Sequence, residues 1–292
     1  MKLLAISDLH LHYEVNRDAL AALPAHPDDW LIVAGDVGEG EADLHLVFDQ
    51  LARRFERLFW VPGNHELWTH PRTGSTLRGV EKYEACVRVC REHGVVTPED
   101  PFVRWEGPGG PAWIVPLFLL YDYSFAPDGM DPEAAIAWAR EAGVVCLDER
   151  FLHADPHDDK VAWCHDRVAS TLARLEPLDR SIPWVLVNHF PLRGDLTRLP
   201  AIPRFRIWCG TTATEDWHRR FPVSVVVSGH LHMPATDWRD GVRFEEVSLG
   251  YPSHWNVSLG MEAHLREILP GPRETVAGDA ATVWRRLKRW SD

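Results

Sequence analysis

The sequence predicts an α/β fold, and two patterns support this prediction. Short runs rich in Val, Ile and Leu alternate with longer segments whose apolar residues recur at helical spacing. The short runs are apolar at almost every position, which is typical of strands that are buried on both faces between helices. With 292 residues and 45% apolar composition the chain can bury a substantial core, and we expect a single domain over residues 1–292.

Six short apolar runs are predicted to be strands, because their length and their Val, Ile and Leu content fit buried strands better than helices. They are residues 2–7, 30–35, 57–63, 112–120, 183–188 and 223–229. Three segments, residues 41–55, 76–94 and 131–143, are predicted to be helices. The first has acidic residues in its first turn and arginines in its last, which suits the helix dipole. Gly94 and Gly143 end the other two.

Composition limits the partners and the compartment. The formal net charge of −12 argues against nucleic acid as a partner, because phosphate backbones attract basic surfaces. No apolar run approaches the roughly 18 residues of a membrane-spanning helix, and the N-terminus does not resemble a signal peptide. Five cysteines, an odd number without a zinc-type CxxC pair, suit reduced thiols. We therefore expect a cytoplasmic protein with no membrane partner, and leave its oligomeric state open.

Polar residues follow five of the predicted strands. In chain order these residues are Asp8 and His10, Asp36, Asn64 and His65, His189, and His230 and His232. Side chains at positions i and i+2 of an extended chain project to the same side, so His230 and His232 are expected to point together. A single histidine at a strand end is more often structural than functional. Five occurrences in order favour one site at the rim of the sheet, where α/β folds bind ligands.

These residues resemble the motifs of the calcineurin-like metallophosphoesterases. The matching motifs are Asp8-Leu-His10, Gly35-Asp36, Gly63-Asn64-His65-Glu66, His189 and Gly229-His230-Leu-His232, in the family's order over residues 1 to about 250. The resemblance implies a four-layer α/β/β/α sandwich with a dinuclear metal site at the carboxyl ends of the strands. The implied ligands are Asp8, His10 and His232 for one ion and Asn64, His189 and His230 for the other, with Asp36 bridging both.

The resemblance also implies the chemistry. Oxygen and imidazole ligands without thiolates suit two divalent transition-metal ions, with Mn favoured and Fe or Zn as alternatives. A hydroxide that bridges the metals would attack the phosphorus of a phosphate ester. His65 resembles the proton donor to the leaving oxygen, with Glu39 as its orienting acid and Glu66 as the other candidate. Gly40 stands where related protein phosphatases have an arginine, which disfavours that activity.

Other segments are expected to set the specificity. Residues around 67–180 are long for a scaffold alone, and we expect a cap-like insertion there. Arg193 is the favoured clamp for a substrate phosphate, with a solvent-facing role as the alternative. Tyr251 is expected to line the pocket. The histidines of residues 153–165 could indicate a third metal, but we favour a solvated loop.

The sequence thus predicts a dinuclear metal-dependent phosphoesterase that acts on a small phosphorylated metabolite or nucleotide. A phosphomonoester is favoured as substrate over a phosphodiester. Two further alternatives are a phosphoprotein phosphatase and a non-catalytic protein-binding scaffold of the same fold. The complete set of expected ligands speaks against the scaffold.

Overall fold

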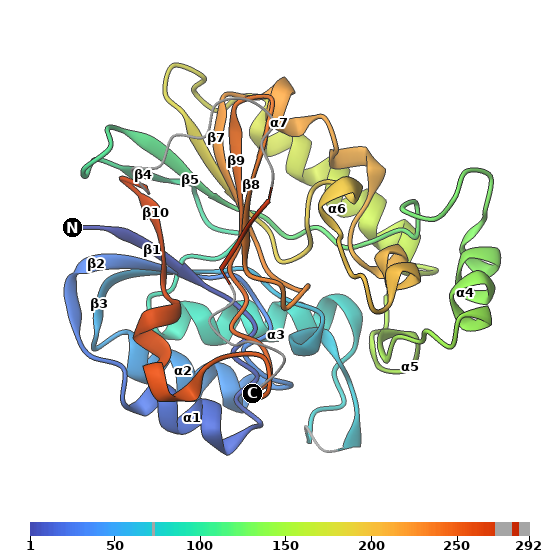
Figure 1. Ribbon diagram of the computed structural model, residues 1–292, viewed down its shortest axis with the longest axis horizontal. Helices are drawn as coiled ribbons and strands as arrows, with labels where there is room; N and C mark the ends of the chain where they lie inside the picture. Colours follow the sequence, from blue (N-terminus) through green and yellow to red (C-terminus); the bar gives the residue numbers. More distant parts are fainter. Residues whose placement is uncertain (72–73, 272–281, 286–292) are drawn as a thin grey trace.

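Two stacked β-sheets with helices on both outer faces form the centre of the molecule (Figure 1). The computed structural model describes residues 1–71, 74–271 and 282–285. Alternate residues of each central strand belong to different apolar clusters. In the first strand Leu3 and Ala5 pack between the sheets, and Leu4 and Ile6 pack under the helices. The four-layer α/β/β/α arrangement is therefore confirmed.

The first sheet has four strands. In spatial order they are β10 (Arg266–Leu269), β1 (Leu3–Ile6), β2 (His26–Val33) and β3 (Phe55–Trp60). β1, β2 and β3 are parallel, and β10 runs antiparallel to β1. The helices below it in Figure 1 are α1 (Glu14–Ala21), α2 (Glu41–Leu51) and α3 (Gly79–Glu92). Parallel strands covered on both faces explain why these runs are apolar throughout.

The second sheet has seven strands. In spatial order they are β11 (Val283–Trp284), β8 (Ala235–Arg239), β9 (Val242–Glu246), β7 (Val223–Ser228), β6 (Trp184–Val187), β5 (Ala112–Pro116) and β4 (Val103–Trp105). β5, β6, β7 and β9 are parallel, β4 and β8 pair antiparallel with β5 and β9, and β11 pairs antiparallel with β8. α6 (Lys160–Leu175) and α7 (Trp217–Arg220) lie beside this sheet (Figure 1). All six predicted strands are present, but the sequence did not predict β4 or β8 to β11.

Aromatic side chains join the two sheets. Trp30 of β2 meets Trp105 of β4 edge to face, with ring centroids 5.0 Å apart, and Phe59 of β3 at 5.7 Å. All three rings are buried in the cluster between the sheets. Such ring pairs add about 0.5–1.5 kcal/mol beyond the area that they bury. The Trp30–Trp105 pair joins strands of different sheets, so it helps to fix one sheet against the other, whereas Phe59 belongs to the same sheet as Trp30.

The three predicted helices are confirmed, but they are shorter than predicted, and α3 spans Gly79–Glu92 within the predicted residues 76–94. The prediction for residues 41–55 is too long, because α2 ends at Leu51 and β3 already begins at Phe55. The guanidinium of Arg54 binds the carbonyl oxygens of Ala21 and Leu23 at 2.9 and 2.8 Å, which turns the chain toward the sheet. The third predicted helix is α4 (Pro132–Glu141), and Asp131 caps it by accepting a hydrogen bond from the backbone N–H of Ala134.

Helix α6 lies partly in a segment that we interpreted as a solvated loop. Its N-cap is Asp159, which accepts a hydrogen bond of 2.7 Å from the backbone N–H of Ala162. His165 lies on this helix and is largely exposed. His153 lies in the loop before the helix and contacts the guanidinium of Arg78. Among the described residues none of the groups able to hold a metal includes these histidines.

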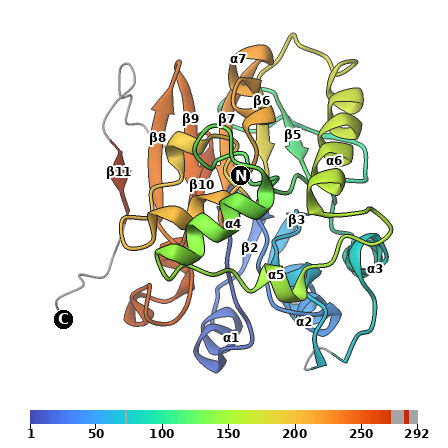
Figure 2. The same ribbon diagram turned by 90° about the vertical axis from the view of Figure 1, so that its right-hand side faces the viewer.

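The stretch 67–180 has two kinds of structure. Its first half supplies α3, β4 and β5, which belong to the layers of the sandwich. Its second half supplies α4, the short helix α5 (Asp148–Phe151) and α6, which lies beside the second sheet. Figure 2 shows α4 and α5 in front of the sheets, at the end of the sandwich that faces the viewer. The single-domain boundaries and the cap-like role of this stretch stay predictions.

No helix in the part of the chain that the structure describes is both long and apolar enough to cross a membrane.

Candidate metal centre

The polar residues that follow the central strands converge on one place. Three groups, within each of which one potential ligand atom per residue lies within 4.8 Å of the others, overlap there. They are Asp8, His10 and His232; His10, Asp36 and His65; and Asp36, His189 and His230. These side chains come from the ends of both sheets, so the site joins the two halves of the sandwich.

The backbone at this site is strained. Five predicted ligands have a positive φ, which L-residues seldom adopt: Asp8 (57°), His10 (44°), Asp36 (52°), His230 (73°) and His232 (51°). Over residues 1–71, 74–271 and 282–285 only two other non-glycine residues do so. A left-handed residue costs about 1–3 kcal/mol and persists only where its surroundings impose it, typically at functional sites. The strain therefore indicates that these five residues belong to one functional site.

Glycines allow the ligand loops to approach each other. A Cβ atom on Gly63 would collide with the Asp36 carboxylate, and one on Gly229 would collide with Ser7 and Asp8. Gly35 has a φ of 91°, and a Cβ there would lie 2.7 Å from Nδ1 of His189. Each glycine of the sequence motifs is thus required because backbone or ligand atoms occupy the space of a side chain.

In the first group the Asp8 carboxylate is fixed from one side. Its Oδ2 accepts hydrogen bonds from the backbone N–H of His230 (3.0 Å) and the hydroxyl of Ser248 (2.7 Å). Its Oδ1 lies 3.0 Å from Nε2 of His232, and that nitrogen lies 3.0 Å from Nε2 of His10. Burial and the neighbouring His65 keep the pKa of His10 well below its usual value. A neutral imidazole, an imidazole partner and a carboxylate oxygen therefore converge on one point.

In the second group hydrogen bonds set the imidazole tautomer. Nδ1 of His189 donates to the carbonyl oxygen of Ala34 at 2.8 Å, so Nε2 is directed toward Asp36 Oδ2 at 3.5 Å. Burial opposes protonation of His189, but without an ion the Asp36 carboxylate outweighs it and raises the pKa of His189 to about 10; a cation bound at Nε2 would displace that proton. Burial and the nearby His189 lower the pKa of His230 to about 3, so this imidazole is neutral.

Buried polar atoms without a hydrogen-bond partner indicate whether metal ions fit this site. Within the described residues, buried Nε2 of His189, Nε2 of His230 and Oδ1 of Asn64 have no hydrogen-bond partner. Buried polar atoms without partners are rare and require an explanation. Imidazole nitrogens and amide or carboxylate oxygens are ligands of Mn, Fe and Zn. The residues present therefore fit divalent transition-metal ions.

His65 lies beside the groups, with Glu39 near it. The backbone N–H of His65 donates to Asp36 Oδ1 at 2.9 Å, and its Nε2 lies 3.9 Å from Asp36 Oδ2. Its Nδ1 lies 4.0 Å from the Glu39 carboxylate, too far for a hydrogen bond. Glu39 instead bonds Nε2 of His70 at 2.9 Å. The structure thus brings His65 and Glu39 together without a direct hydrogen bond.

Glu66 connects the ligand loops. Its carboxylate accepts hydrogen bonds from the backbone N–H groups of Asp36 (3.0 Å), Val37 (2.8 Å) and Gly63 (2.9 Å). Burial, followed by the charge of Asp36, raises the pKa of Glu66 to about 7. The carboxylate oxygens are thus taken up by the loops after β2 and β3, so Glu66 positions these loops rather than the His65 ring.

We expect Glu66→Ala to destabilise the protein by about 3 kcal/mol or more, since it leaves three buried N–H groups without an acceptor and each costs about 1–3 kcal/mol. Denaturant unfolding of the metal-free protein measures this loss. Glu84→Ala is the matched control, because Glu84 is exposed on α3. Equal unfolding midpoints for the two variants would contradict this role for Glu66.

The two predicted substrate residues differ in their surroundings. The Tyr251 ring lies 4.6 Å from the ring of His10 and 4.7 Å from that of His232, next to the first group. The guanidinium of Arg193 contacts the Asp195 carboxylate at 2.8 Å and the carbonyl oxygen of Glu215 at 3.2 Å. The structure therefore brings Tyr251 to the predicted ligands and gives Arg193 partners outside that set.

Sequence reasoning missed several residues that support the ligands. Ser248 anchors Asp8, and Asp148 accepts a hydrogen bond of 3.0 Å from Nδ2 of Asn64. The ring of Trp68 lies 3.8 Å from that of His65. Ser248 and Asp148 contact ligands 240 and 84 positions away. Contacts between residues so far apart cannot be predicted from a local sequence pattern.

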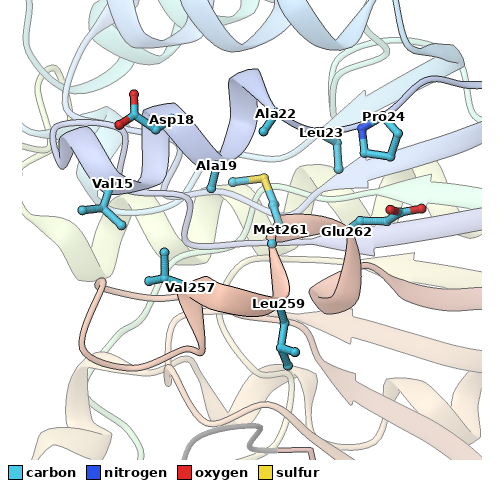
Figure 3. A pocket seen from close by; sticks show the side chains of 11 residues that line it. Val15, Asp18, Ala19, Ala22, Leu23, Pro24, Val257, Leu259, Met261 and Glu262 are labelled. Atoms are coloured by element: carbon cyan, nitrogen blue, oxygen red, sulfur yellow. The ribbon is translucent and has the colours of Figure 1, made fainter.

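A groove of about 360 Å³ lies between α1 and residues 257–262 (Figure 3). Apolar side chains line most of it, among them Val15, Leu23, Leu259 and Met261. It contains none of the predicted site residues, so it is separate from the candidate metal centre.

Comparison with known proteins identifies the class. A model of the calcineurin-like phosphoesterases matches residues 1–234. The chain belongs to this family, and it is a metal-dependent hydrolase of phosphoric esters.

Individual relatives give more detail than the family model. The acyl-carrier-protein phosphodiesterase PptH of Mycobacterium tuberculosis (strain ATCC 25618 / H37Rv) is 51% identical over 271 residues, which cover 92% of this chain and 83% of the relative. The crystal structure of phosphopantetheinyl hydrolase (PptH) from M. tuberculosis superposes with a TM-score of 0.89 at 50% identity and covers 94% of this chain and 98% of that chain. A putative 5′-nucleotidase from Staphylococcus aureus, with 12% identity and a TM-score of 0.38 over 84% of this chain and 48% of that chain, is too distant to support an argument.

Proposed function

We propose that this protein is a metal-dependent phosphodiesterase that removes the phosphopantetheinyl group from an acyl carrier protein. The observation that supports this most is the 51% identity to the M. tuberculosis enzyme over 92% of the chain. From the sequence alone, a phosphomonoester of a small molecule is favoured as the substrate. The relatives support the phosphodiester alternative instead, together with a protein as the partner.

The proposed metal ligands are those that the family resemblance implies. Asp8, His10 and His232 would hold one ion, and Asn64, His189 and His230 the other, with Asp36 between them. The convergence of these side chains and their unpartnered buried atoms support this assignment. Mn is the favoured ion, with Fe or Zn as alternatives. When bound, the ions would polarise the phosphoryl oxygens and lower the pKa of a water molecule that attacks the phosphorus.

The residues of the chain supply positioning and a proton. Water adds across the phosphodiester, the P–O bond to the carrier protein's hydroxyl breaks, and that oxygen needs a proton as it leaves. We assign the proton to His65, since an imidazole can hold one near neutral pH and this ring lies beside the ligands. Glu39, whose carboxylate lies 4.0 Å from the other ring nitrogen, is the residue proposed to orient the ring. Tyr251 would line the approach to the ions.

Arg193 remains a proposed phosphate contact. To reach a substrate its guanidinium would have to leave Asp195 and the carbonyl oxygen of Glu215. Kinetics of Arg193→Ala with unchanged metal content would test this: a lower kcat/KM supports the contact, and an unchanged value removes it.

The purified protein is expected to contain about two transition-metal ions per chain, because its seven proposed ligands form two sets that share Asp36. Elemental analysis measures the content. Chelation should abolish hydrolysis, and added Mn should restore it. The dinuclear assignment would be contradicted if the purified protein contained no metal and added Mn did not activate it.

The proposed substrate is tested by incubating the Mn-loaded enzyme with a phosphopantetheinylated acyl carrier protein. Intact-protein mass spectrometry should record loss of the phosphopantetheinyl group and appearance of the unmodified carrier. Bis-p-nitrophenyl phosphate and p-nitrophenyl phosphate compare a diester with a monoester. Hydrolysis of the monoester alone, with the carrier protein unchanged, would contradict the proposal.

The cytoplasmic location is part of the same proposal. All five cysteines are free thiols, and four of them are buried, which suits a reducing compartment. Fractionation of cells that produce the protein tests the location.

A further inference from the structure

The carboxylate of Asp148 is fully buried at the start of α5. One of its oxygens, Oδ1, accepts two hydrogen bonds, from Nδ2 of Asn64 at 3.0 Å and from Nε1 of Trp68 at 2.7 Å. Both donors come from the segment that follows β3. Asp148 lies outside the family motifs, in the stretch between the third and fourth of them.

The bond to Asn64 decides which atom of the amide faces the candidate metal centre. A side-chain amide has its oxygen and its NH2 group on opposite sides. Because the NH2 group donates to Asp148, Oδ1 points away from it, and among the described residues this buried oxygen has no partner. The opposite orientation would lose the bond to Asp148 and turn hydrogens toward a cation.

The bond to Trp68 acts on the neighbouring histidine. The indole ring of Trp68 lies against the imidazole of His65, with 3.8 Å between the ring centroids. Since Asp148 fixes the indole nitrogen, it also fixes the surface on which His65 rests. The same oxygen thus supports a proposed metal ligand and the proposed proton donor.

Backbone contacts fix the position of α5, and with it the position of Asp148. The N–H of Thr69 donates to the carbonyl oxygen of Phe151 at 2.9 Å, and Trp68 pairs with Leu152 as an antiparallel bridge. Asp148 therefore reaches the site from a segment that is itself bonded to residues 68–69. This is the point at which the second half of the stretch 67–180 contacts the candidate metal centre.

We propose that Asp148 is a positioning residue that turns the Asn64 oxygen toward the second metal ion and holds Trp68 against His65. This inference rests on the proposed dinuclear function. It assigns the effect to the hydrogen-bond acceptor at Oδ1. Partners that orient metal ligands typically change metal affinity by about 10–100-fold when they are removed.

Two substitutions separate the acceptor from the charge. Asp148→Asn can keep an oxygen at the position of Oδ1 and removes the charge, whereas Asp148→Leu has similar bulk and no acceptor. Calorimetric titration of the metal-free proteins with Mn²⁺ should give two sites in the unaltered protein. In Asp148→Leu one site should keep its affinity and the other should weaken by about 10–100-fold. Asp148→Asn should stay within about threefold of the unaltered protein, a difference of about 0.65 kcal/mol or less.

Controls keep the test specific. Asp158→Leu makes the same change at an exposed position of the neighbouring loop and should bind both ions normally. In an Asn64→Ala background, Asp148→Leu should add nothing to the loss of affinity, because its effect passes through Asn64. If Asp148→Leu does not fold, Asp148→Ala replaces it with the same expectations.

Two results would overturn the inference: unchanged binding of two ions by the folded leucine variant, or an equal loss in the asparagine variant. An unaltered protein that binds fewer than two ions would instead overturn the dinuclear function.

Discussion

Asp36→Asn is expected to lose both metal ions and to lower kcat/KM for the phosphodiester by about 10³-fold or more, equivalent to about 4 kcal/mol. Asp36 belongs to two of the three groups at the site, and its Oδ2 lies 3.5 Å from Nε2 of His189. The amide oxygen of the asparagine can still accept the hydrogen bond that the N–H of His65 makes to Oδ1. The local fold should therefore persist while the shared negative charge is lost.

Elemental analysis and steady-state kinetics together measure this effect. Asp49→Asn is the matched control, because Asp49 is exposed on α2 and pairs with a surface arginine, Arg53. Circular dichroism should give the same fold for both variants. Retention of two ions by Asp36→Asn would show that this carboxylate does not bridge the metals.

His65→Ala is expected to keep both ions and to lower hydrolysis of alkyl phosphodiesters by about 10²–10⁴-fold, the usual contribution of general acid catalysis. An alkoxide leaving group needs a proton, whereas p-nitrophenolate leaves readily without one. The loss on bis-p-nitrophenyl phosphate should therefore be much smaller. Single-turnover measurements on both substrates compare the chemical step directly.

The position of His65 makes this comparison informative. Its ring belongs to one of the groups that could hold an ion, together with His10 and Asp36, so geometry alone does not separate a proton donor from a ligand. His165→Ala, at a largely exposed histidine of α6, should change neither metal content nor rate. Glu39→Gln should give a weaker form of the same selectivity. Loss of metal, or equal losses on both esters, would assign His65 a different role.

The alternation of apolar runs predicted the central strands and three helices because these patterns are local. A buried parallel strand needs apolar side chains on both faces, and the runs that became β1, β6 and β7 show this directly. Several strands with polar residues escaped prediction. β9, which lies between β8 and β7, reads Val-Arg-Phe-Glu-Glu although all five residues are buried, since Arg266 and Arg285 pair with its Glu245.

The sequence motifs could not distinguish a phosphomonoester from a phosphodiester as the substrate. The motifs predicted an ester of phosphate because they describe the ligands of the ions, and those ligands serve monoesters and diesters alike. The preference for a diester came from a relative with similarity over nearly the whole chain. Discrimination between substrates depends on residues around the metals that no short motif records.

The sequence by itself determined the ligand types and their order, because each strand is followed directly by its own polar residues, as in Gly35-Asp36 and Gly229-His230-Leu-His232. Only the tertiary structure decided how these residues are held. Glu66 spans two loops, Glu39 bonds His70 rather than His65, and Asp148 orients Asn64 from 84 residues away. Such contacts form between segments that the folded sheets bring together, and hydrogen bonds between distant segments leave no periodic trace in the chain.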